Sequence, residues 1–120
     1  MKLIVGVQAK KKIDLLQKSD KKINGFLIGT KIAKYTVISD LLLYGFNKDD
    51  LSDAYGSVYK HWGFKLKGFF YRNTNVLFDD YFYEKIIMEI NENGTDCYFC
   101  RIDCNEKSKR KIEKMKYIFI

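Results

Sequence analysis

The stretch that decides the fold is residues 24–40, NGFLIGTKIAKYTVISD. Its apolar run from Phe26 to Ile28 is bounded by Gly25 and Gly29, and residues 33–38 then alternate along the chain. Apolar runs bounded by glycine and period-two alternation are both typical of β-strands. The stretch therefore predicts two antiparallel strands joined near residues 30–32.

Two amphipathic helices are expected on either side of this strand pair. Residues 8–20, QAKKKIDLLQKSD, place Ala9, Ile13 and Leu16 on one face and lysines on the other. Residues 49–63, DDLSDAYGSVYKHWG, predict the second helix. Acidic residues stand at its N-terminus, which carries partial positive charge, and Gly63 ends it. Their apolar side chains recur at helical spacing and should lie in the core: Leu51, Ala54, Tyr55, Val58, Tyr59 and Trp62.

A third helix is expected over about Asp79 to Glu92, where large apolar side chains recur every four residues. Residues 2–7, 65–71, 95–103 and 114–120 have the short apolar character of strands. Paired strands between helices predict an α+β fold. The expected architecture is a mixed, largely antiparallel sheet or partial barrel with three helices, in a single domain over residues 1–120.

The positive charge of the chain lies mainly near its two ends. The 120 residues carry a formal net charge of +7. Basic patches hold polyanions, although lysine-rich helix faces are also common as plain solvated surface. Nucleic-acid contacts, if this charge serves them, are expected at Lys10, Lys11, Lys12, Lys109, Arg110 and Lys111.

Apolar runs and cysteines in the sequence indicate where in the cell the protein is located. The N-terminal apolar run is much shorter than a secretory signal, and no run approaches the length of a membrane span. Three cysteines, Cys97, Cys100 and Cys104, do not suggest a disulfide framework. We therefore expect a cytoplasmic protein without a membrane partner.

Three short motifs resemble the MPN (JAB/JAMM-like) domain. They are GFLIG at Gly25–Gly29, ISD at Ile38–Asp40 and GFFYRNT at Gly68–Thr74, which is where the family carries Gly-x-x-His-x-His-Pro. Together with the order of elements, the resemblance covers nearly the whole chain. It implies a layout like that of MPN and cytidine-deaminase domains.

The departures from the family pattern concern the zinc site. Active members hold zinc with two histidines and an aspartate, while a glutamate acts on the bound water. The histidine positions fall here on Tyr71 and Asn73, and the glutamate position falls on Lys22. Asp79 or Asp80 alone could stand for the aspartate. Phenol and amide groups are poor zinc ligands, and an ammonium group repels the metal.

The resemblance therefore implies a non-catalytic protein-interaction or scaffold module with no metal or other cofactor. Such a module would pair with another protein subunit, either one that contains an MPN domain or a second copy of this chain. The surface expected to take part in this interaction is the degenerate site. It is made of Lys22, Tyr71, Arg72, Asn73, Asp79 and Asp80.

Two other functions remain open at this point. One is a nucleic-acid-binding module that uses the lysines near the ends, and the other is an isopeptidase-like hydrolase with an unconventional site. The chain has a single histidine, His61, so a two-histidine metal site lacks ligands. Strand alternation points Cys97 and Cys100 to opposite faces, which favours ordinary strand cysteines over a metal or redox site.

Overall fold

The computed structural model describes residues 2–47, 49–74, 84–102 and 110–120. Along the chain its elements are β1 (Lys2–Val5), α1 (Val7–Gln17), β2 (Ile23–Ile32), β3 (Tyr35–Leu43), α2 (Leu51–Trp62), the 3-10 turn η1 (Gly63–Lys65), β4 (Leu66–Arg72), β5 (Lys85–Asn91), β6 (Gly94–Ile102), β7 (Arg110–Met115) and β8 (Tyr117–Phe119).

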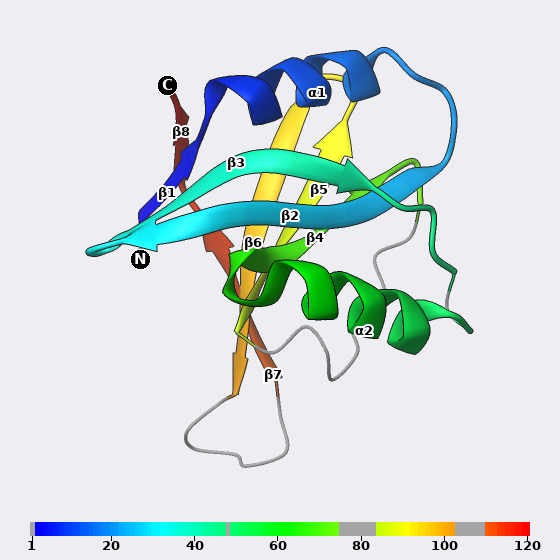
Figure 1. Cartoon of the computed structure of the whole chain (residues 1–120). Helices are drawn as coiled ribbons and strands as arrows, with labels where there is room; N and C mark the ends of the chain where they lie inside the picture. Colours follow the sequence, from blue (N-terminus) through cyan, green and yellow to red (C-terminus); the bar gives the residue numbers. More distant parts are fainter. Residues whose placement is uncertain (1, 48, 75–83, 103–109) are drawn as a thin grey trace.

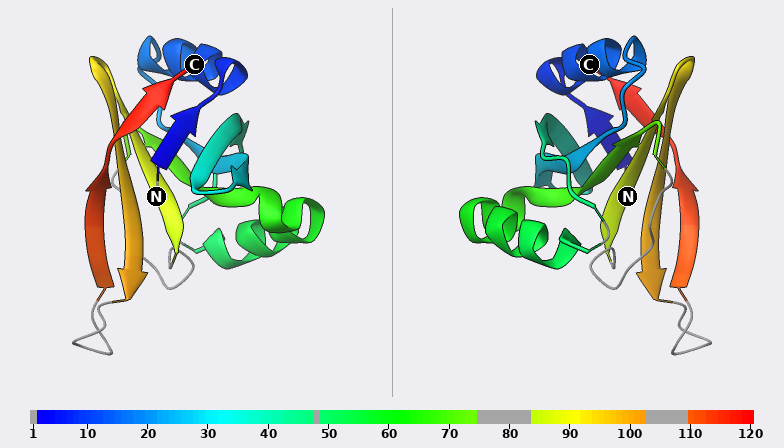
Figure 2. Two further views of the ribbon diagram at one scale, coloured as in Figure 1. Left: turned by 90° about the vertical axis from the view of Figure 1, so that its left-hand side faces the viewer. Right: turned by 90° about the vertical axis from the view of Figure 1, so that its right-hand side faces the viewer.

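The strands form one sheet in the order β7, β6, β5, β4, β2, β3, β1, β8. Its two outermost strands, β7 and β8, are separated in the chain by Lys116 alone. The C-terminal segment therefore pairs with β6 through its first half and with β1 through its second half. As a result the sheet curls into a nearly closed barrel (Figure 1 and Figure 2).

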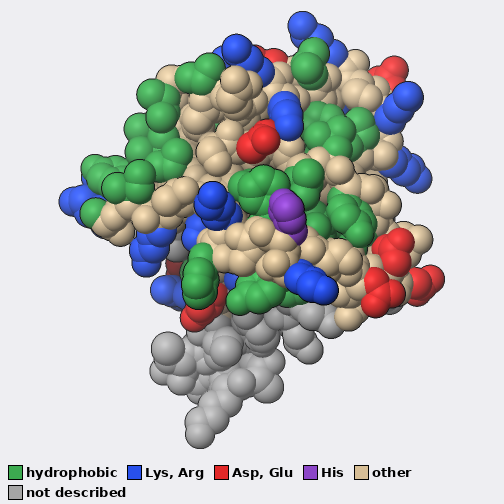
Figure 3. Space-filling view, in the orientation of Figure 1, with side chains coloured by type: hydrophobic (Ala, Val, Ile, Leu, Met, Phe, Trp, Pro, Cys, Tyr) green, Lys and Arg blue, Asp and Glu red, His purple; other side chains and the backbone are tan. Residues whose placement is uncertain are grey.

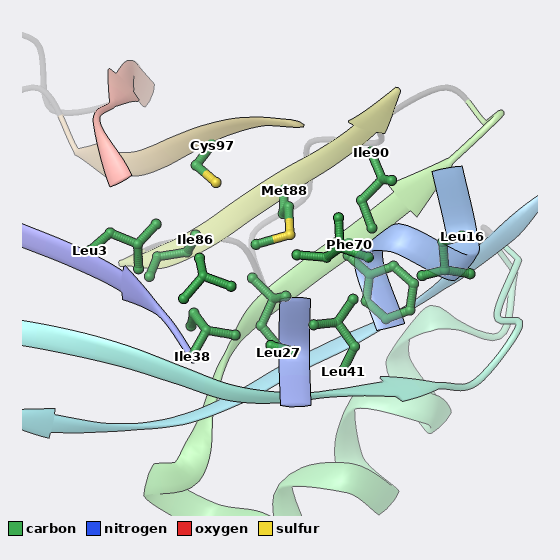
Figure 4. Close-up of a cluster of buried hydrophobic side chains, with 13 residues drawn as sticks. Leu3, Leu16, Leu27, Ile38, Leu41, Phe70, Ile86, Met88, Ile90 and Cys97 are labelled. Atoms are coloured by element: carbon green, nitrogen blue, oxygen red, sulfur yellow. The ribbon is translucent and has the colours of Figure 1, made fainter. Parts of the chain in front are cut away.

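Buried side chains form two clusters, one on each face of the sheet. The first fills the inside of the barrel together with α1 (Figure 4) and contains Leu3, Val5, Ala9, Ile13, Leu16, Leu27, Ile38, Leu41, Phe70, Ile86, Met88, Ile90 and Cys97. The second lies under α2 on the outer face and contains Phe26, Ile28, Phe46, Leu51, Ala54, Val58, Leu66, Phe69, Tyr71, Ile87 and Cys100. Strands β2, β4 and β5 contribute to both clusters, so they are buried on both faces.

The glycines of the matched motifs lie where the backbone of a neighbouring strand passes close. A Cβ atom on Gly25 would come within 2.0 Å of the Leu42 carbonyl oxygen, and one on Gly68 within 1.8 Å of the Ile86 carbonyl oxygen. Gly29 is placed in the same way against β3. These positions accept only glycine because any side chain would overlap the sheet backbone.

The helices expected over residues 8–20 and 49–63 are confirmed as α1 and α2. Ala9, Ile13 and Leu16 are the buried residues of α1, as their spacing predicts. In α2 the buried residues are Leu51, Ala54 and Val58. Tyr59, also expected in the core, is 47% exposed.

The expected three-helix layout is wrong, because the described residues contain only two α-helices beside a nearly closed eight-stranded sheet. The third helix was expected over Asp79 to Glu92, but β5 runs through Lys85–Asn91, parallel to β4. A strand buried on both faces is apolar at successive positions, so its pattern cannot be told from a buried helix by periodicity. Residues 75–83 lie outside the described residues.

The hairpin between β2 and β3 turns slightly later than the sequence suggests. The strands pair as far as Ile32 and Tyr35, so the turn consists of Ala33 and Lys34 rather than residues 30–32. Ala33 takes a left-handed conformation with φ of 53°. The longer hairpin extends the sheet beyond the inner core.

Candidate functional site

The start of β2 and the end of β4 lie side by side, where the resemblance places a zinc site. In the antiparallel register Ile23 faces Arg72 and Asn24 faces Tyr71. One step further along the same register, Lys22 comes next to Asn73. The fold thus brings together three of the six residues expected at the degenerate site: Lys22, Arg72 and Asn73.

Arg72 is buried and holds the end of α1. Its Nε donates to the Leu16 carbonyl at 2.9 Å, and its Nη2 donates to the Gln17 carbonyl at 3.0 Å. Leu16 and Gln17 are the last two residues of α1, whose final turn carries no basic side chain of its own. The Leu16 carbonyl also accepts from the Ser19 N–H at 3.1 Å. Carbonyl groups at a helix end carry partial negative charge, so a guanidinium group stabilises them.

Asn73 fastens the segment that leads from α1 into β2. Its Nδ2 donates to the backbone carbonyls of Ser19 and Lys21, both at 3.3 Å. The residue has a φ of 55°, a left-handed conformation that asparagine tolerates better than most residues. The amide is therefore engaged by backbone oxygens, and Asn73 works as a structural link between two segments.

Tyr71 points away from this group. It is 2% exposed and belongs to the outer core, where its ring packs against Phe46 with centroids 5.9 Å apart. The expectation that Tyr71 forms part of a surface with its neighbours is wrong, because side chains alternate along β4. Lys22 is exposed, and Asp79 and Asp80 lie outside the described residues.

A polar hollow of about 600 Å³ lies beside Arg72, between the end of α1 and the β5–β6 turn. Its acidic groups are Asp14, Asp20 and Glu92. In the described ranges no three His, Cys, Asp or Glu side chains are grouped closely enough to hold a metal ion.

The lysines near the two ends are not gathered into one surface. Lys10 pairs with Asp14 at 3.5 Å, and Lys12 pairs with Asp40 at 2.7 Å. Lys11 is exposed on the same helix. The second group of expected nucleic-acid contacts includes Arg110 and Lys111, which lie at the start of β7. This strand begins far from α1 (Figure 1).

Within that second group, Lys111 pairs with Glu113 at 3.4 Å. Arg110 begins β7, and Lys109 lies outside the described residues. The structure therefore separates the two sets of residues expected to contact nucleic acid, and it pairs several of them with carboxylates.

A different group of lysines forms where three strands meet. Lys67 lies next to Lys85 in the parallel β4–β5 register, and Lys31 on β2 is close enough to act on Lys67 electrostatically. Burial, followed by the charges of Lys85 and Lys31, holds the pKa of Lys67 below its usual range. Since these residues come from distant parts of the chain, the sequence alone gives no signal for this cluster.

The position of Lys67 follows from an irregularity in the sheet. Leu27 faces Gly68 whereas Ile28 faces Leu66, so Lys67 is an extra residue on β4. Such a β-bulge redirects the side chain of the extra residue.

An exposed aromatic side chain precedes this bulge. Phe64 in η1 is 89% exposed, the largest exposed fraction of the large apolar residues that the structure describes. Ile32, near the end of the neighbouring strand β2, is 59% exposed. We call Lys31, Phe64, Lys67 and Lys85 the bulge patch. In Figure 3, basic and hydrophobic side chains gather around the end of the β2–β3 hairpin, and acidic ones at the start of α2.

The cysteines behave as strand residues. Cys97 belongs to the inner core and Cys100 to the outer one, which confirms that they point to opposite faces of β6. Burial and then the neighbouring Asp96 raise the pKa of the Cys97 thiol to about 12. A thiol of that pKa is a poor nucleophile and a poor metal ligand at neutral pH. Cys104 lies outside the described residues.

His61 is exposed on α2 beside Trp62, their rings 5.2 Å apart. None of the helices in the described ranges is long and apolar enough to span a bilayer.

The chain matches no model of a protein family, and no curated protein matches it.

Proposed function

We propose that this chain is a non-catalytic, MPN-like protein-interaction module that pairs with another protein subunit through the bulge patch. The observation that carries the proposal is the exposure of Phe64, 89% of whose surface is open to solvent in the 3-10 turn that precedes the bulge at Lys67. Aromatic side chains are enriched at the energetic centres of protein interfaces.

Phe64 is presented on ordered structure. η1 follows α2 directly and leads without a break into β4, so its backbone is fixed at both ends. A side chain held out in this way loses little conformational freedom on binding, which favours affinity. The lysines around it add a charge that an acidic partner surface would complement.

The residues of the degenerate site support a non-catalytic role. Arg72 and Asn73 donate to backbone carbonyls of the segment that ends α1, and Tyr71 packs in the outer core. Groups engaged in this way serve the fold. An isopeptidase-like reaction would need them to be released from these contacts.

A protein partner is favoured over nucleic acid by the composition of the bulge patch. Proteins that bind nucleic acid track the phosphate backbone with an extended series of basic groups. The bulge patch contains an exposed aromatic side chain and lies away from the lysines of α1, two of which already pair with carboxylates.

Site-specific photo-crosslinking in the source cells tests the proposal. The variant Phe64→p-benzoylphenylalanine places the crosslinker in the bulge patch, and Leu15→p-benzoylphenylalanine is the matched control. Leu15 is 69% exposed, but it lies on α1 at another part of the surface. We expect a discrete adduct with one protein from position 64 and none from position 15.

The same experiment can contradict the proposal. Adducts of equal yield from both positions would indicate random collisions, and no adduct from position 64 would remove the bulge patch as an interface. An adduct with a second copy of this chain would show that the chain pairs with itself as a homodimer. Changing Lys67 and Lys85 to methionine in the crosslinker variant should reduce the adduct.

A further inference from the structure

A second surface lies on the outer face of β3, β1 and β8, and neither helix covers it. The core residues of α1 belong to the inner cluster, and α2 packs on the outer cluster, whose strand residues come from β2, β4, β5 and β6. In the left view of Figure 2, β1 and β8 face the viewer with no helix in front of them. This face is therefore open along its length.

The strand register arranges the side chains of this face in two rows. Lys2 faces Tyr35 on β3, and the pairing of Leu3 with Tyr117 puts Lys116 on the other side of Lys2. The first row is thus Tyr35, Lys2, Lys116. Because every second residue of a strand shares a face, the next row is Val37, Ile4, Ile118.

The two rows enclose a groove of about 440 Å³, within the range of small-molecule sites. Its walls include Lys2, Ile4, Tyr35, Lys116 and Ile118. Ile118 is 62% exposed, so the apolar floor is open to solvent. The ammonium group of Lys2 lies 5.7 Å from the centroid of the Tyr35 ring, which keeps it over the first row.

The charges of this groove are of one sign. Lys2 and Lys116 are directly opposite on adjacent strands, an arrangement that destabilises a sheet. On β2 the neighbouring positions of the two rows are Ile32 and Thr30, so no described residue on this part of the face is acidic. In the described part of the chain, neither lysine takes part in an ion pair.

We propose that this groove binds a small anionic amphiphile, such as the anion of a fatty acid. The carboxylate would lie between the ammonium groups of Lys2 and Lys116, where it offsets their repulsion. The aliphatic chain would cover Ile4 and Ile118 and remove their apolar surface from water. Two like charges at one end of an apolar floor match a ligand with one anionic end and one apolar end.

Titration of the full chain with decanoate below its micelle concentration, followed by backbone amide chemical shifts, tests the proposal. We expect saturable shifts at residues 2–4, 35–37 and 116–118. The double variant K2M/K116M should bind decanoate at least about tenfold more weakly, since each lost ion contact weakens binding severalfold. Ile118→Ser should also weaken binding by removing part of the floor.

The matched control is K11M/K21M, which removes the same charge from exposed lysines outside the groove. It should leave the decanoate affinity within about twofold, because charges this far away are screened by salt. K2M/K116M removes a like-charge pair, so it should melt no lower than the wild-type chain, which keeps the binding result interpretable.

Four results would overturn this assignment. Decanoate could fail to bind, or K11M/K21M could weaken binding as much as K2M/K116M. Decyltrimethylammonium, which has the same tail and the opposite charge, could bind equally well. The chain could also bind vesicles of anionic lipid without binding monomeric decanoate, which would indicate a membrane surface as the source of the anion.

Discussion

Single residues carry functions in this fold that their positions in the sequence motif do not suggest. Arg72 lies between the two positions where the resemblance expects histidines, and it holds the end of α1 through two backbone carbonyls. Hydrogen bonds from a charged donor are stronger than neutral ones, and Arg72 is only 7% exposed. The residue therefore couples the end of β4 to the end of α1.

Arg72→Met is expected to lower the free energy of unfolding by about 3 kcal/mol, since two hydrogen bonds from a charged donor to the end of α1 are lost. Urea denaturation measures this change. Lys22→Met, at the exposed neighbouring position, should change stability by no more than about 0.5 kcal/mol. Equal effects of the two changes would show that Arg72 does not hold α1.

Gly68→Ala should destabilise the chain by about 3 kcal/mol or more, because the new methyl group would overlap the backbone of β5. Gly56→Ala is the control: Gly56 is in the middle of α2, where a Cβ meets nothing within 4 Å. That change should raise stability by about 1 kcal/mol, the usual gain of alanine over glycine in a helix. Thermal unfolding of both variants separates the two cases.

The lowered pKa of Lys67 predicts how stability depends on pH. Below its usual pKa of 10.5, the unfolded chain binds more protons at this group than the folded one does. Stability should therefore rise as pH increases through the alkaline range towards that value. Lys67→Met should flatten this rise and raise the melting temperature at neutral pH, more at low salt than at high salt. A lower melting temperature at low salt would contradict the like-charge account.

At the scale of elements, local pattern predicted the two helices that have one buried face and failed at strand β5. The apolar spacing of α1 and α2 is visible in the sequence because each helix has one buried face. Strand β5 has two buried faces, and Ile86, Ile87 and Met88 are apolar in succession, so its period is hidden. The bulge at Lys67 likewise moves Leu66 to the face opposite Phe70, although regular alternation would put both on one face.

The closing strand depends on a short set of contacts that can be tested. The Tyr117 hydroxyl donates to the Thr95 carbonyl at 2.9 Å and also meets the Thr95 hydroxyl, so it ties the start of β8 to β6. Tyr117→Phe should cost about 1 kcal/mol and speed hydrogen exchange in β8 and β1. Tyr59→Phe, at an exposed position on α2, should alter neither quantity. Unchanged exchange in β8 would mean that these bonds do not secure closure.

For the whole molecule, the order of strands in the sheet creates the surfaces that the sequence could not reveal. Lys31, Lys67 and Lys85 meet through the order of β2, β4 and β5, and Lys2 meets Lys116 only because β8 pairs with β1. Lys22, Arg72 and Asn73 were grouped by the resemblance, and they lie close together here because β2 pairs with β4. Strand β8 pairs with β1, which lies at the other end of the sequence. The residues that meet in such a pair depend on the register of the whole sheet and not on local pattern.

Arg72 and Asn73 fasten the end of α1 and the segment that follows it, and we propose that the chain acts by binding a partner rather than by zinc chemistry. The most direct test is elemental analysis of chain purified without chelator, together with Asn73→Ala and with a variant in which Cys97, Cys100 and Cys104 are replaced by alanine. We predict no stoichiometric zinc in any of the three proteins. Stoichiometric zinc that survives replacement of the cysteines and is lost in Asn73→Ala would contradict this account. It would indicate a working metal site that includes Asn73.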